Sequence, residues 1–83
     1  MKVSVKYFAS IRETIGLSCE AVTTAAPTLA ALRDELIAQG GVHAEALVRG
    51  RVVRMALNQV MCDESTALLE GAEVAFFPPV TGG

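Results

Sequence analysis

The chain has 83 residues, of which 52% are hydrophobic and 19% are charged, and its formal net charge is −2. This balance is typical of one small globular domain and excludes a largely disordered chain. With three phenylalanines, one tyrosine, no tryptophan and no excess of basic residues, the chain lacks the positive field and the stacking surface of a nucleic-acid binder, so no nucleic-acid partner is expected.

Signals for targeting, disulfides and metal binding are weak throughout the chain. No apolar run approaches the ~20 residues that cross a bilayer, and the alternation at residues 1–6 is not that of a signal peptide, so we expect a cytoplasmic protein with no membrane partner. Cys19 and Cys62 are isolated, which predicts reduced thiols. The single histidine, His43, lies among helix-favouring residues, and neither a metal site nor a catalytic role is predicted for it.

The N-terminal third predicts two strands joined by a short helix. Residues 2–8 alternate with period two, as in a half-buried strand. One face would carry Val3, Val5 and Tyr7, and the other Lys2, Ser4, Lys6 and Phe8. Ser10 and Glu13 have the spacing of a capping box, and Gly16 suits the left-handed residue that ends a helix, so one or two helical turns are expected. Residues 17–23 predict a second strand in which Cys19 and Val22 face opposite sides.

The middle of the chain predicts the main helix. Thr28, which follows Pro27, can cap this helix, and Gly40-Gly41 ends it. Its apolar face has the spacing i, i+3, i+7, i+8 and consists of Leu29, Leu32, Leu36 and Ile37. The alanine-rich segment 42–49 predicts a further short helix closed by Gly50.

The C-terminal third predicts three strands. Residues 52–58 alternate, with Val53, Met55 and Leu57 on one side. Asn58-Gln59 predicts a turn into a short strand at 60–62, and Glu70-Gly71 a turn into a last strand at 73–77. The order β, β, α, β, β, β with short helical insertions indicates an α+β fold, the β-grasp or ubiquitin-like architecture, in which a mixed sheet packs on one long helix. In this architecture, assigned to residues 1–77, the first and last strands are parallel neighbours.

Two phenylalanines are predicted on the face of the sheet away from the main helix. Alternation in the last strand separates Phe77 from Phe76, and Phe8 interrupts the polar series of the first strand. If these strands are neighbours, Phe8 and Phe77 form one exposed apolar patch that suits docking to a partner, with Arg12 at its rim. The alternatives are that the short helix or the two prolines after Phe77 cover the rings, and that Arg12 is a solvated helix charge.

Residues 78–83 predict an extended tail. Pro78 and Pro79 end the last strand and favour polyproline geometry, so Val80 and Thr81 would lead outward to Gly82 and Gly83. A backbone without side chains enters a slot too narrow for a Cβ, which makes the carboxylate of Gly83 accessible to another protein. That carboxylate is a poor electrophile at neutral pH and needs activation by a separate, ATP-using enzyme. The alternative is a frayed chain end without a role.

Three segments carry a resemblance to a known family over nearly the whole chain. They are VKYFASIRE at residues 5–13 with Gly16, ALR at residues 31–33, and ALNQ at residues 56–59 leading to EVAFFPPVTGG at residues 73–83. The last segment is highly specific, whereas a bare Gly-Gly end is not. On these residues the chain resembles the small, sulfur-carrying subunits of molybdopterin synthases.

The resemblance implies a sulfur carrier rather than a catalyst. Gly83 would be adenylated by an ATP-dependent activating enzyme, converted to a thiocarboxylate with a sulfurtransferase as donor, and inserted into the large synthase subunit. There its sulfur goes to cyclic pyranopterin monophosphate and forms the dithiolene of molybdopterin. The large subunit would supply the acid, the base and the substrate site, while this chain binds no cofactor. The resemblance also implies a heterotetramer, and it places Phe8, Arg12 and Phe77 at the subunit interface together with tail residues 78–81.

Three other functions are compatible with the same residues. A sulfur carrier for thiazole or another thio-cofactor has the same fold and Gly-Gly end, although such carriers are usually shorter and lack the Phe-Phe-Pro-Pro approach. A protein modifier would join activated Gly83 to a lysine of a target protein. A plain interaction module would have an inert end, and an extra residue after Gly83 would then have no consequence.

Overall fold

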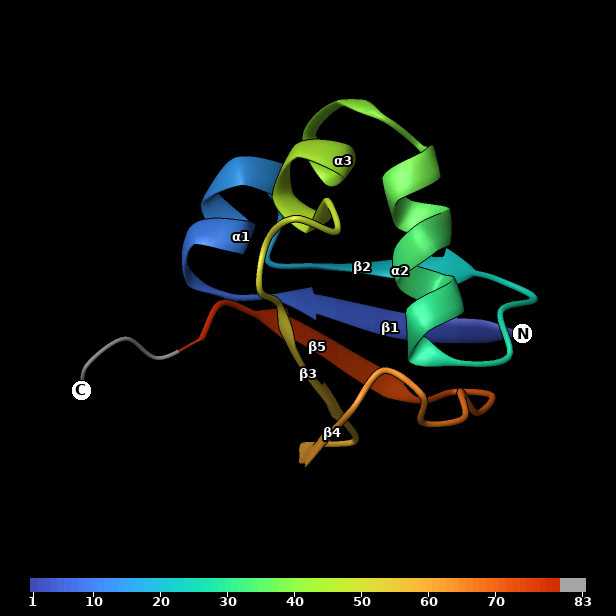
Figure 1. The fold of residues 1–83 in the computed structure, drawn as a ribbon. Helices are drawn as coiled ribbons and strands as arrows, with labels where there is room; N and C mark the ends of the chain where they lie inside the picture. Colours follow the sequence, from blue (N-terminus) through green and yellow to red (C-terminus); the bar gives the residue numbers. More distant parts are fainter. Residues whose placement is uncertain (80–83) are drawn as a thin grey trace.

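The computed structural model describes residues 1–79, in which three helices lie on one face of a mixed five-stranded sheet (Figure 1). In chain order the elements are β1 (Lys2–Tyr7), α1 (Ala9–Ile15), β2 (Cys19–Thr23), α2 (Leu29–Ala38), α3 (Gly41–Leu47), β3 (Arg54–Leu57), β4 (Val60–Cys62) and β5 (Glu73–Phe77). The predicted α+β element order and β-grasp architecture are confirmed. The longest helix, α2, has ten residues, and it shares the face of the sheet with α1 and α3, which have seven each. Within the described residues, no helix combines the length and the hydrophobicity needed to cross a membrane.

The strand order in the sheet is β2-β1-β5-β3-β4. The central pair, β1 and β5, is parallel, with Val5 opposite Val74 and Tyr7 opposite Phe76, as predicted for the first and last strands. The other three pairs are antiparallel. Because β5 lies between β1 and β3, Pro78 and Pro79 follow a strand that is hydrogen-bonded on both sides.

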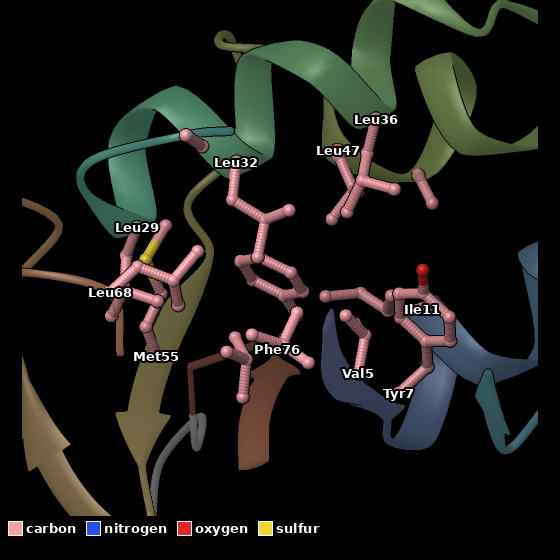
Figure 2. Close-up of a cluster of buried hydrophobic side chains, with 14 of the residues drawn as sticks. Val5, Tyr7, Ile11, Leu29, Leu32, Leu36, Leu47, Met55, Leu68 and Phe76 are labelled. Atoms are coloured by element: carbon pink, nitrogen blue, oxygen red, sulfur yellow. The ribbon is translucent and has the colours of Figure 1, made fainter. Parts of the chain in front are cut away.

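The core lies between the sheet and the helices, with the Phe76 ring near its centre below Leu32 (Figure 2). Its largest fully buried side chains are Tyr7, Phe76, Leu29, Leu32, Leu36, Leu47, Val3, Val5 and Val74. Burial of each contributes about 1.5 to 3 kcal/mol before conformational entropy is subtracted. The period-two face of β1 and the first three leucines of the α2 face are therefore confirmed, while Ile37 is only partly buried at the edge of this core.

The start of α1 differs from the predicted capping box. The helix begins at Ala9, its N-cap is Phe8, and no side chain caps it. The backbone amides of Ile11 and Arg12 donate directly to the carbonyl of Phe8, so Ser10 already lies inside the first turn and cannot cap it. The predicted C-terminal end is confirmed, because Gly16 adopts a φ of 86° and its amide donates to the carbonyl of Arg12.

The predicted cap of α2 is confirmed, since the Thr28 side chain accepts a hydrogen bond of 3.2 Å from the amide of Ala31. The segment after α2 departs from the prediction. Helix α3 ends at Leu47 rather than near Gly50, because Val48 leaves helical geometry with a ψ of 143°. Strand β3 begins at Arg54 rather than at residue 52, since Arg54 is opposite Phe77, the last residue of its partner β5.

The two predicted turns are confirmed by their backbone angles. Asn58 and Gln59 have φ of 50° and 70°, as in the two-residue turn that matches the twist of a hairpin, and they join β3 to β4. Gly71, with a φ of 76°, precedes β5, and its amide donates to the carbonyl of Lys2.

Candidate partner-docking surface

Phe8 and Phe77 lie next to each other where the two central strands end. Their ring centroids are 6.5 Å apart and the ring planes meet at 86°, an edge-to-face contact. The contact forms because the amide of Phe8 donates to the carbonyl of Phe76, which extends the parallel ladder between β1 and β5 by one residue. Phe8 is 44% exposed and Phe77 is half-buried. The predicted apolar patch therefore exists, and neither ring is buried in the body.

The apolar surface continues from this aromatic pair across the outer face of the sheet. Ala75 shares the face of Phe77 and lies in register with Ala56 on β3, which in turn is opposite Met61 on β4. Ala56 is buried and Ala75 half-buried, while Met61 at the edge is 60% exposed. Lys6 of β1 is in register with Ala75, so a charged residue borders these apolar residues.

Arg12 lies one helical turn beyond Phe8, and its backbone amide donates to the Phe8 carbonyl at 3.2 Å. Its side chain is exposed. An exposed side chain is compatible with both sequence interpretations of Arg12, a rim contact and a solvated helix charge, so the rim contact stays a prediction.

Pro78 and Pro79, the described part of the predicted tail, are half-buried. They line a surface hollow of about 250 Å³ together with residues of α1, the end of α3 and the segment 51–53. The base of the tail thus rests on the body between α1 and the segment that leads into β3. Val80, Thr81, Gly82 and Gly83, which complete the predicted tail, lie outside the described residues.

A hydrogen-bonded cluster of Tyr7, Glu20 and His43 was not predicted. The Tyr7 hydroxyl donates to Glu20 Oε2 at 2.7 Å, and His43 Nε2 lies 2.7 Å from the same oxygen. Burial, and then the hydrogen bond to Glu20, raises the pKa of Tyr7 far above its usual value, so the phenol is a neutral donor. Desolvation opposes ionisation of Glu20, but the hydrogen bonds from His43 and Tyr7 outweigh it and lower the pKa of that carboxyl. The cluster ties α3 to the first two strands.

The structural role of Arg33 on α2 was also not predicted, although Arg33 belongs to the ALR segment that carries the family resemblance. Its side chain is almost fully buried and donates to three backbone carbonyls: those of Leu47 at 2.8 Å, Val48 at 3.0 Å and Arg51 at 3.0 Å. Burial and then the nearby Arg49 lower the pKa of Arg33, but a guanidinium stays charged throughout the physiological range. Arg33 therefore fixes the main chain that follows α3. Part of this segment, residues 51–53, lines the hollow beside the prolines. No sequence pattern indicates this role, because the acceptors are main-chain atoms.

The chain matches the model of the ThiS family over residues 5–83. It is 42% identical to the molybdopterin synthase sulfur carrier subunit of Escherichia coli, over 98% of this chain and 99% of that protein. It is 38% identical to the protein of the same name from Haemophilus influenzae, with the same coverage.

Solved structures agree with this similarity. One partner in a complex of subunits 1 and 2 of molybdopterin-converting factor from Helicobacter pylori is 31% identical, with a TM-score of 0.69 over the whole of both chains. A putative molybdopterin-converting factor subunit 1 from Pyrococcus furiosus is 26% identical, with a TM-score of 0.77 over 96% of this chain and 99% of that one. The small archaeal modifier protein SAMP1 from Haloferax volcanii, 24% identical with a TM-score of 0.79 over the whole of both chains, shares the fold. From its sequence and its fold, the chain belongs to the ThiS family, among the relatives of the molybdopterin synthase sulfur carrier subunits.

Proposed function

We propose that this chain carries sulfur in the biosynthesis of the molybdenum cofactor. The observation that supports the proposal most strongly is the similarity, over nearly the full length of both chains, to the sulfur carrier subunit of E. coli. The aromatic pair supports it independently, because it provides an exposed docking surface beside the base of the tail.

The proposed chemistry takes place at the carboxylate of Gly83. A carboxylate oxygen attacks the α-phosphorus of ATP on an activating enzyme and releases pyrophosphate, which leaves an acyl-adenylate on Gly83. The outer sulfur of a sulfurtransferase persulfide then attacks the acyl carbon and displaces AMP, and a thiol reductant cleaves the S–S bond of the resulting acyl disulfide. The product is a thiocarboxylate, whose sulfur is a soft nucleophile. ATP belongs to the activating enzyme, and this chain itself holds no cofactor.

The proposed acceptor complex is a molybdopterin synthase. The Helicobacter pylori structure, a complex of two subunits of molybdopterin-converting factor, supports a large subunit as the docking partner of this chain. Phe8, Phe77 and Arg12 contact that partner, and residues 78–83 reach its substrate site. There two thiocarboxylated copies of the chain, one after the other, each give one sulfur to cyclic pyranopterin monophosphate, and the two sulfurs form the dithiolene of molybdopterin. The assembly is a heterotetramer in which this chain acts as a co-substrate and the large subunit is the catalyst.

Among the alternative functions, a carrier for thiazole or another thio-cofactor would use the same chemistry with a different acceptor. The names of the E. coli and H. influenzae relatives favour molybdopterin. A protein-modifier function gains no support from SAMP1, because an identity of 24% shows a common fold alone.

The intact mass of the protein from cells that contain the activating enzyme tests the chemistry. We expect a fraction of the chain to be heavier by the difference between one sulfur and one oxygen atom, with the extra mass on the terminal residue. A chain that lacks Gly82 and Gly83 should show no such species and should fail to restore molybdopterin synthesis in cells without their own carrier subunit. Its melting temperature should match that of the full chain, which controls for folding. Restored synthesis by the shortened chain would contradict the proposal.

A further inference from the structure

Most of the exposed positive charges that have no ion-pair partner among residues 1–79 lie at one end of the molecule. Of the seven Lys and Arg residues, all of which the structure describes, Lys6, Arg33 and Arg49 form ion pairs with carboxylates. Four exposed cations have no carboxylate within ion-pair distance in the described part of the chain, and three of them, Arg12, Arg51 and Arg54, surround the base of the tail. We refer to these three as the arginine collar.

Each member of the collar is placed by a contact that is independent of the others. Arg54 is opposite Phe77 across the β3–β5 ladder, so its side chain shares the outer face of the sheet with that ring. Arg12 follows Phe8 by one helical turn. Arg51 lines the same hollow as the two prolines, and its backbone carbonyl is fixed by the buried Arg33 at 3.0 Å. The fold therefore fixes the backbone position of each collar arginine.

The carboxylates are distributed differently. Most are engaged within the body or lie away from the tail: Glu20 with Tyr7 and His43, Glu35 with Thr24, Asp34 and Glu64 with Arg49, Glu73 with Lys6, and Glu70 with the amide of Lys2. The acidic residues on α1 and α3 are Glu13 and Glu45, both exposed, and Asp63, which accepts from the amide of Ser65, lines a hollow together with Arg54. Carboxylates therefore also lie near the collar, since Glu13 follows Arg12 on α1 and Asp63 shares a hollow with Arg54. Among the described residues, none of them is within ion-pair distance of a collar arginine, so the guanidinium groups stay available to a partner.

The geometry points to an acidic protein surface, at the entrance that receives the tail, as the partner of the arginine collar. Guanidinium forks match carboxylates in a two-point geometry, and the exposed apolar side chains between them, Phe8 and Val52 at 44% and 65%, fit a protein surface. The collar steers the chain toward its partner with the tail first. This inference rests on the proposed function and adds the charge of the partner surface to it.

Stopped-flow association with the large synthase subunit of the same organism tests the steering. The test variant is Arg51→Gln/Arg54→Gln, which removes two exposed charges that have no ion-pair partner in the described residues. At an ionic strength of about 0.01 M, where charges interact over about 30 Å, we expect the double variant to associate roughly 3- to 10-fold more slowly than the wild type. At about 1 M salt the two rates should converge, since the screening length falls to about 3 Å.

Two further variants separate steering from other effects. Lys2→Gln removes an exposed charge at the start of β1, where the chain lies against Gly71 and Glu70, and should leave the association rate unchanged. Arg51→Lys/Arg54→Lys retains the charge and should restore most of the rate. A double Gln variant that associates as fast as Lys2→Gln, or a wild-type rate that rises with salt, would overturn the inference. So would a short DNA duplex that binds the wild type and not the double Gln variant, because the collar would then serve a polyanion. Failure of the wild-type chain to form any complex with the large subunit would instead overturn the proposed function, and the inference with it.

Discussion

Two adjacent phenylalanines of β5 have different roles. The Phe76 ring is fully buried and stacks with Tyr7 at a centroid distance of 6.3 Å, whereas the Phe77 ring lies on the opposite face of the sheet against Phe8. The strand pleat alone separates them, because successive side chains point to opposite faces. A pair of substitutions one residue apart can therefore distinguish docking from folding.

We expect Phe77→Ala to weaken binding to the large synthase subunit and to change stability little. Loss of the edge-to-face contact costs about 0.5 to 1.5 kcal/mol of unfolding free energy, whereas removal of a docking aromatic costs about 2 kcal/mol or more of binding free energy. Phe76→Ala is the matched control and should lose about 3 to 5 kcal/mol of stability through the cavity that it leaves. Urea unfolding and titration calorimetry provide the two measurements. If the Phe77→Ala variant binds normally but is strongly destabilised, Phe77 contributes to folding and not to docking.

The hydrogen bonds of Glu20 predict that part of the unfolding free energy is lost in acid. Its pKa is lower in the folded chain than its usual value, so the stabilisation is fully present above the unfolded pKa of about 4.3 and is lost as the pH falls through the folded pKa. We expect Glu20→Gln to cost about 1 kcal/mol at neutral pH and to flatten the decline in stability below pH ~4.3. Urea midpoints over an acid pH series measure both effects. Glu45→Gln, an exposed carboxyl on α3, serves as the control, and the same acid decline in the Glu20→Gln and Glu45→Gln variants would refute the role of the cluster.

At the scale of elements, α2 has two functions. Its leucine face fills the core, and Arg33 on the same helix holds the main chain between α3 and β3. The carbonyls at the end of a helix lack intrahelical partners, and here a single guanidinium from a neighbouring helix supplies donors for two of them and for the following loop. This contact lies at the end of α3, where Val48 leaves helical geometry.

We expect Arg33→Met to destabilise the chain by about 2 to 4 kcal/mol, because it leaves the carbonyl of the buried Leu47 without its side-chain donor and removes two more hydrogen bonds, to Val48 and Arg51. Arg33→Lys should recover only part of the loss, since an ammonium lacks the planar fork that reaches several acceptors. Arg49→Met is the control: its pairs with Asp34 and Glu64 are exposed to solvent, so it should cost less than about 1 kcal/mol. Chemical denaturation of the three variants tests this order. An Arg33→Met loss no larger than that of Arg49→Met would contradict it.

At the scale of the whole molecule, the sheet order determines where the docking surface lies. The first and last strands meet at the centre of the sheet, and the segment after β5 leaves the body at the end opposite the N-terminus (Figure 1). Phe8 and Phe77, which are 69 positions apart in the sequence, become neighbours by this pairing alone. The arginine collar lies at the same end, so apolar contact and charge coincide there.

The sequence by itself was sufficient for the elements that depend on local periodicity. The alternation in β1 and β5, the Thr28 cap, the leucine spacing of α2 and the Asn58-Gln59 turn are short-range patterns, and each was confirmed in the structure. The same periodicity also placed Phe8 and Phe77 on the outer face. The family resemblance, rather than periodicity, led from that face to a sulfur carrier.

Tertiary structure alone decided the features in which a residue contacts main-chain or side-chain atoms that are far from it in the sequence. The capping box failed because the backbone carbonyl of Phe8, rather than the Ser10 hydroxyl, accepts the first amides of α1. The contacts of Arg33 and the cluster around Glu20 join residues that are 13 to 23 positions apart, which no local pattern encodes. The arginine collar likewise arises only when β3 pairs with β5, because pairing through backbone hydrogen bonds brings side chains together regardless of their spacing in the sequence.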